Sequence, residues 1–204
     1  MRRWNRWNFQ ISSQMLLIAA LMFLVLPPQW VFAAIVAAVW HELCHVFAVK
    51  LCKGRIQTIV VGADGAVIEC MLMKPGREAV CILAGPLGSI LLLSLANWLP
   101  RLALCGCFHG LYNFIPVYPL DGGRALRTLA FALLPPERAE WICTIIGSAV
   151  MILIVGVAFA GTFFMDLGAL PVLLAGTLLF RMKREKLLAN FRDRGYNRPT
   201  IVKR

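Results

Sequence analysis

Val31 to Leu51 reads V-F-A-A-I-V-A-A-V-W-H-E-L-C-H-V-F-A-V-K-L, and every residue before His41 is apolar. A run of this length can cross the hydrocarbon core of a bilayer, which takes about 20 residues of helix. The segment must then be helical, because each unpaired backbone group in lipid costs several kcal/mol. We therefore predict a membrane-spanning helix with its polar residues toward one end, where the basic residues Lys50, Lys53 and Arg55 follow.

The polar end of this helix carries the pattern H-E-x-x-H. On a helix, His41 and His45 lie on one face, one turn apart, where two imidazoles can hold a single metal ion. Glu42 lies beside that pair, and its carboxylate can take the proton from a water molecule that attacks an amide carbonyl. Cys44 lies on the opposite side of the histidine pair from Glu42, and we expect it to be a small packing residue. The pattern predicts a metal site with a general base.

The composition of the whole chain is that of a membrane protein. Of its 204 residues, 60% are hydrophobic and 15% are charged, and the mean hydropathy is +0.75. The formal charge of +11 comes from basic residues at the ends of apolar segments and in the tail, which favours cytoplasmic membrane flanks over nucleic-acid binding. The seven cysteines are odd in number and several lie in apolar runs, so we expect no stable disulfides.

We predict an α-helical polytopic membrane protein with about six transmembrane helices. The first, from about Ile11 to Leu26, follows a basic and aromatic lead-in and has no small-residue cleavage site after it, so we expect an uncleaved span. In the third, Gly85 and Pro86 are expected to interrupt the helix. The later helices are expected at about 31–51, 77–98, from 102 onward, 137–160 and 167–182, with a shorter one at 124–134.

A small membrane-associated β-hairpin is predicted between the second and third helices. β-branched residues stand on both sides of Asp64-Gly65 in the segment from Ile56 to Met73, which is typical of two strands joined by a tight turn. The edge of such a hairpin can pair with an extended peptide. This segment lies just beyond the helix that carries the histidines.

The segment from Asn113 to Gly123 contains two prolines and two glycines, so an uninterrupted helix is excluded there. Non-helical backbone at membrane depth is tolerated only where it is buried in protein or lines a wet cavity. An acidic residue in such a place is a functional candidate. Asp121 is therefore the best third metal ligand. Glu69, Asp64 and His109 remain as alternatives, with His109 expected to be a packing residue.

The distribution of positive charge predicts the orientation. With six spans and a cytoplasmic N-terminus, the basic regions all face the cytoplasm, as the positive-inside rule requires. The far end of the second helix and Asp121 then lie near the same cytoplasmic face. We expect one transmembrane domain over residues 1–182 and a basic cytoplasmic tail over 183–204.

Three motifs in order resemble the site-2 protease family of intramembrane zinc metalloproteases: H-E-L-C-H, A-G-P-L-G and N-F-I-P-V-Y-P-L-D-G-G. The resemblance implies one Zn²⁺ per chain on His41, His45 and Asp121, with Glu42 as the catalytic base. It also implies that Asn113 orients the substrate or donates to the developing oxyanion. Ser89 stands where many members have asparagine, which argues against a role for that position.

Within the family, the chain is most similar to the sporulation protease of endospore formers, which cleaves a membrane-associated sigma-factor precursor. The resemblance implies an integral membrane metalloendopeptidase of a bacterial cell or forespore membrane that cleaves a membrane-embedded or membrane-associated protein. Inhibitory membrane proteins or further copies of the chain are the other expected partners. Two alternatives stay open: a catalytically silent protein of the same fold that binds clients, and a metal transporter.

Overall fold

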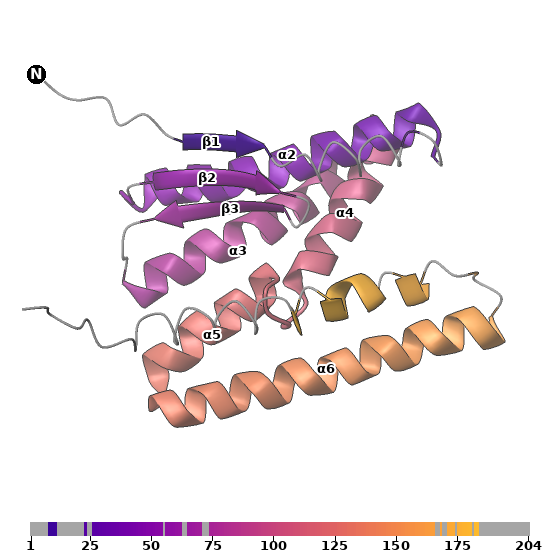
Figure 1. Cartoon of the computed structure of the whole chain (residues 1–204). Helices are drawn as coiled ribbons and strands as arrows, with labels where there is room; N and C mark the ends of the chain where they lie inside the picture. The colour runs from indigo at the N-terminus through magenta and orange to yellow at the C-terminus, as the bar shows by residue number, and fades with distance from the viewer. Residues whose placement is uncertain are drawn as a thin grey trace, which may run out of the picture. The chain divides into compact units, whose positions relative to one another are not determined.

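The computed structural model describes residues 8–11, 23, 26–54, 56–62, 65–70, 74–165, 168, 171–173, 175–180 and 182–183. The chain divides into two compact units, Met1–Thr144 and Ile145–Arg204. Figure 1 shows the elements, which in chain order are β1 (Asn8–Ile11), α2 (Pro28–Leu51), β2 (Ile56–Gly62), β3 (Gly65–Cys70), α3 (Pro75–Leu91), the 3₁₀ helix η1 (Leu92–Leu95), α4 (Pro100–Phe114), α5 (Asp121–Leu133) and α6 (Pro136–Phe164).

Three helical segments of the described residues are long and apolar enough to cross a membrane, namely Pro28–Leu51, Pro75–Leu95 and Pro136–Phe164. They correspond to the second, third and fifth predicted spans. The first predicted span falls almost wholly outside the described residues, and the sixth is described only in pieces. α4 has 15 residues and so extends about 23 Å, which is shorter than the hydrocarbon core. The total of six spans stays a prediction.

Prolines mark the beginnings of these helices. Pro28, Pro75 and Pro100 each occupy the first turn of a helix, where the missing backbone N–H costs nothing and the fixed φ angle suits the helix. Pro86 is different because it lies inside α3. The predicted interruption at Gly85 and Pro86 is therefore wrong. Pro86 is fully buried, and the packing around it compensates for the one lost hydrogen bond.

The three strands form one sheet in the order β1-β2-β3 (Figure 1). β2 and β3 pair antiparallel, with Val60 opposite Val67 and Gly62 opposite Gly65, whereas β1 pairs with β2 in parallel. Asp64, in the predicted turn, lies outside the described residues. Ile11 belongs to β1, so the prediction that a helix begins there is wrong. Pairing of the backbone with a distant strand determines the conformation of these four residues. The hydropathy of the residues themselves does not indicate this pairing.

Within the first unit, α3 contacts α2, α4 and α5. Two glycines of α4 allow a close approach to it: a Cβ on Gly106 would lie 2.9 Å from the Ser89 carbonyl oxygen, and one on Gly110 would lie 2.8 Å from that of Pro86. Small residues four apart are the usual means by which membrane helices pack closely. α3 thus lies within reach of both helices that carry the predicted ligands.

The link between α4 and α5 is shorter than predicted. α4 includes Asn113 and ends at Phe114, and α5 begins at Asp121 rather than at Arg124. A Cβ on Gly122 would lie 2.6 Å from the Ile115 carbonyl oxygen and closer still to Phe114. Both glycines of this segment thus permit the first turn of α5 to fold against the preceding backbone. This close return directs Asp121 toward α2.

Candidate metal centre

Two helices supply three buried side chains that meet at one point. His41 and His45 lie one turn apart on α2, and Asp121 is the first residue of α5. Their exposed fractions are 2%, 9% and 7%. Among the described residues, these three form the one group of histidine, cysteine and acidic side chains placed to hold a metal ion, with ligand atoms within 4.8 Å of one another.

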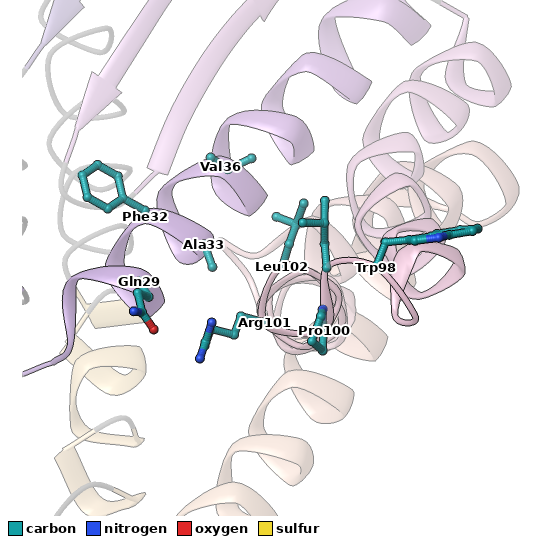
Figure 2. Close-up of a pocket in the computed structure, with 9 residues that line it drawn as sticks. Gln29, Phe32, Ala33, Val36, Trp98, Pro100, Arg101 and Leu102 are labelled. Atoms are coloured by element: carbon teal, nitrogen blue, oxygen red, sulfur yellow. The ribbon is translucent and has the colours of Figure 1, made fainter.

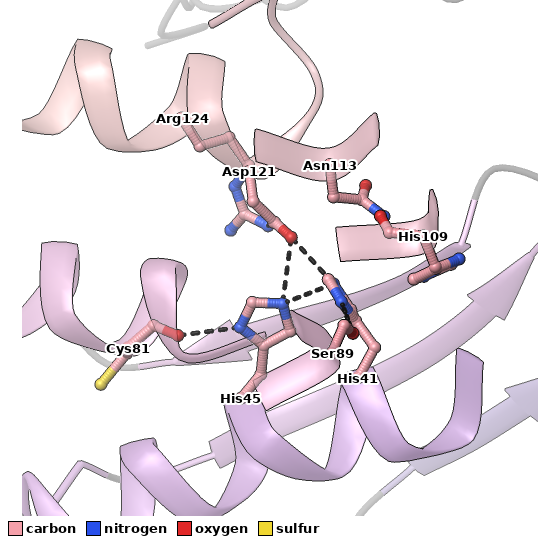
Figure 3. A network of polar contacts seen from close by, with 8 residues as sticks. All are labelled: His41, His45, Cys81, Ser89, His109, Asn113, Asp121 and Arg124. Atoms are coloured by element: carbon pink, nitrogen blue, oxygen red, sulfur yellow. Dashed lines mark hydrogen bonds and ion pairs between the residues drawn. The ribbon is translucent and has the colours of Figure 1, made fainter. Parts of the chain in front are cut away.

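The three ligand atoms form a nearly equilateral triangle (Figure 3). The His41 Nε2 and Asp121 Oδ2 atoms are 3.0 Å apart, the His45 Nε2 and Asp121 Oδ2 atoms 3.1 Å, and the two Nε2 atoms 3.1 Å. A tetrahedral zinc ion with bonds of about 2.0–2.1 Å has ligands roughly 3.3 Å apart. The triangle therefore matches one face of a zinc tetrahedron, which leaves a fourth position for water or substrate.

The hydrogen bonds around the site show that it suits a cation. The His45 Nδ1 atom lies 2.8 Å from the Cys81 carbonyl oxygen. A carbonyl only accepts, so Nδ1–H donates, and Nε2 of the neutral ring then presents a lone pair. The Asp121 carboxylate, 3.1 Å away, is also an acceptor. Two facing lone pairs repel unless a proton or a metal ion lies between them, and the donor set of two imidazoles and a carboxylate suits zinc.

The outer contacts of the site come from α3 and α5. The His41 Nδ1 atom lies 2.9 Å from the hydroxyl oxygen of Ser89, a residue for which no role was expected from the sequence. Arg124 is one turn after Asp121 and its Nη1 atom lies 3.8 Å from Oδ1, which leaves Oδ2 directed at the histidines. Sequence reasoning missed both contacts. The i,i+3 spacing of Asp121 and Arg124 was the available signal for the second.

The two predicted catalytic residues, Glu42 and Asn113, lie on different helices. Glu42 is half-buried on α2 beside His41. The Asn113 amide nitrogen donates to the His109 carbonyl oxygen at 3.1 Å, so this N–H is directed along its own helix (Figure 3). An amide nitrogen carries two N–H groups, so it can donate a second hydrogen bond. The roles of both residues stay predictions.

The alternative ligands do not join the group. The His109 ring packs edge-to-face on the His41 ring, with 4.6 Å between centroids, as expected of a packing residue. The side chains of Glu69 and Asp64 lie outside the described part of the chain. Asp121 is thus the third potential ligand that the described residues provide.

A separate cavity of about 410 Å³ lies between the first turns of α2 and α4 (Figure 2). Gln29 and Arg101 supply its polar lining, and the rest of its lining is apolar. No histidine, cysteine or carboxylate lines it. This cavity offers no metal ligand and is distinct from the histidine site.

Gly85 forms the wall of the metal centre on α3. A Cβ at this position would lie 2.8 Å from the His41 Nε2 atom and closer still to the His45 ring. We expect Gly85→Ala to weaken zinc binding by at least about tenfold, because the methyl group displaces the ligating nitrogens. Gly76→Ala is the matched control, since a Cβ on that α3 glycine meets nothing within 4 Å. Zinc titration of both purified variants tests this, and equal affinities would contradict it.

Comparisons with known proteins agree with this architecture. A family model described as Peptidase M50B-like matches residues 14–134, which include all three converging side chains. Among solved structures, the chain is similar to the Site-2 Protease from Methanocaldococcus jannaschii, with 22% sequence identity and a TM-score of 0.64. That match covers 91% of this chain and 94% of the other. The search of curated proteins gives no match.

Proposed function

Because the chain belongs to the Peptidase M50B-like family, we propose that it is an intramembrane zinc metalloendopeptidase. The observation that carries the proposal is the convergence of His41 Nε2, His45 Nε2 and Asp121 Oδ2 within 3.1 Å of one another. The family resemblance and the three apolar helical segments support a site inside an integral membrane protein. One Zn²⁺ per chain would be held by these three residues.

The reaction is the hydrolysis of a peptide bond. When bound, zinc supplies Lewis-acid polarisation of the scissile carbonyl and acidifies water. Glu42 takes one proton as the water oxygen bonds to the carbonyl carbon. The carbon–nitrogen bond then breaks, and Glu42 returns the proton to the leaving amine. The free N–H of Asn113 donates to the carbonyl oxygen as it gains negative charge.

The substrate must be extended at the site, because the peptide bonds of an intact transmembrane helix are hidden by their own hydrogen bonds. β1 occupies one edge of β2, and β3 is the other outer strand of the described sheet. We assign the outer edge of β3 to the substrate, which would add to the sheet as a further strand. The predicted location of this pairing is near the cytoplasmic face.

The proposed substrate is a membrane-embedded or membrane-associated protein, and its cleavage would release a soluble product. By resemblance to the sporulation subgroup, a sigma-factor precursor is the leading candidate, in a bacterial cell or forespore membrane with both chain termini in the cytoplasm. Inhibitory membrane proteins or further copies of the chain are the proposed regulatory partners.

The test compares new protein N-termini in membranes that contain the wild type or the Glu42→Gln variant. We expect N-termini that map to membrane segments in the wild type and are missing from the variant. These would establish the activity and identify the substrates together. Identical profiles from a host that supplies the native membrane proteins would favour a client-binding protein without catalysis and would contradict the proposal.

A further inference from the structure

We propose that Ser89 is a positioning residue that holds His41 in the tautomer and orientation required for metal binding. The inference rests on the proposed zinc site and extends it to α3. Ser89 is completely buried and His41 is 2% exposed. The Ser89 hydroxyl oxygen lies 2.9 Å from His41 Nδ1 (Figure 3), so the two groups form a hydrogen bond away from water.

The direction of this hydrogen bond matters for the metal. A neutral imidazole carries one proton, and only the ring with its proton on Nδ1 presents the Nε2 lone pair to a metal. A serine hydroxyl can accept from that N–H, and it donates instead when Nδ1 carries no proton. His41 Nε2 faces Asp121 Oδ2 at 3.0 Å, so the opposite tautomer would direct a proton at the carboxylate and block the ligand position. When Nε2 holds a metal, Nδ1 keeps the proton, and the Ser89 hydroxyl is the group placed to accept it.

The second histidine has an equivalent contact from the same helix. His45 Nδ1 donates to the Cys81 carbonyl oxygen at 2.8 Å. Cys81, Gly85 and Ser89 recur every four residues along α3, and positions at this spacing lie on one face of a helix. α3 therefore supplies a hydrogen-bond partner to each imidazole, with Gly85 between them to admit the ligating nitrogens. Outer contacts of this kind fix the tautomer and ring orientation of metal-binding histidines.

The neighbouring helix determines which side chain can fill this position. A Cβ on Gly110 of α4 would lie 3.0 Å from the Ser89 Cβ atom, and one on Gly106 would lie 2.9 Å from the Ser89 carbonyl oxygen. The space is therefore matched to a small residue. The Ser89 hydroxyl oxygen reaches His41 Nδ1 at 2.9 Å in this space.

The experiment measures zinc dissociation constants of purified wild type, Ser89→Ala, Ser89→Cys and Ser94→Ala by competition with a chelator. Ser94 is the control because its exposed hydroxyl bonds only to the Leu91 carbonyl of its own turn among the contacts described, at 2.8 Å. We expect Ser89→Ala to raise the dissociation constant by about 10–100-fold. Ser89→Cys, with a weak acceptor of similar size, should give an intermediate value, and Ser94→Ala should match the wild type.

Thermal unfolding of the zinc-free variants separates positioning from a general structural role. We expect similar midpoints for wild type and Ser89→Cys, because the positioning contact matters chiefly when metal is bound. Unchanged zinc affinity in Ser89→Ala would overturn the inference. The inference would also be overturned if both Ser89 variants lost zinc only to the extent that their zinc-free proteins were unfolded. A wild type that binds no zinc would instead refute the proposed function.

Discussion

Replacing Glu42 with glutamine is expected to leave the zinc content at the wild-type value and to reduce the cleavage rate by about 10²–10⁴-fold. Glutamine keeps the size of the side chain but cannot take a proton from water. Glu42 is not among the converging ligand atoms, so its replacement should spare metal binding. Zinc content by elemental analysis and cleavage of a membrane-embedded substrate, measured on the same preparation, check both expectations.

Glu137→Gln is the matched control for this experiment, because Glu137 is exposed in the first turn of α6. It should retain both zinc and activity. Undiminished turnover in Glu42→Gln would remove Glu42 from the mechanism. Loss of zinc together with activity would show that this carboxylate supports the metal rather than proton transfer.

Replacing Asp121 with alanine is expected to lower zinc affinity by more than the roughly 10–100-fold that is typical of a lost outer contact. The change removes Oδ2, which lies 3.0 Å and 3.1 Å from the two Nε2 atoms. It also leaves two neutral imidazoles without a negative charge to balance the cation. Zinc titration of the purified variant measures the effect, and cleavage activity should fall with metal occupancy.

Asp121→Asn refines this experiment. It keeps an oxygen at the ligand position but removes the charge, so we expect an affinity between those of the alanine variant and the wild type. Unchanged zinc binding in Asp121→Ala would exclude Asp121 as a ligand and would redirect the assignment to Glu69 or His109.

Arg124, which lies 3.8 Å from Asp121 Oδ1, provides an internal check. Its removal should weaken zinc binding less than loss of Asp121 itself.

The family and the three converging residues could be predicted because their signals are local. His41 and His45 lie on one face of any helix that contains them. Asp121 stood out as an acidic residue in an apolar and proline-rich segment. The predicted membership of the site-2 protease family is confirmed, whereas the sporulation subgroup stays a prediction.

The errors arose where distant parts of the chain decide local structure. Ile11 was assigned to a helix, but pairing with β2 makes it part of a strand. Pro86 was expected to interrupt a helix that in fact continues through it, because burial between helices supports the backbone. Gly122 and Gly123 were interpreted as helix breakers, yet they allow α5 to begin early and pack on the preceding segment.

The sequence by itself predicted a membrane protein and singled out two histidines, a glutamate and an aspartate as its candidate reactive residues. Composition and helical periodicity suffice for this, because both act within one segment. Only the tertiary structure decided that α3 supports both imidazoles, through Ser89 and the Cys81 carbonyl. A backbone carbonyl has no signature in the sequence. A buried serine comes within hydrogen-bond distance of His41 only when packing brings the two helices together.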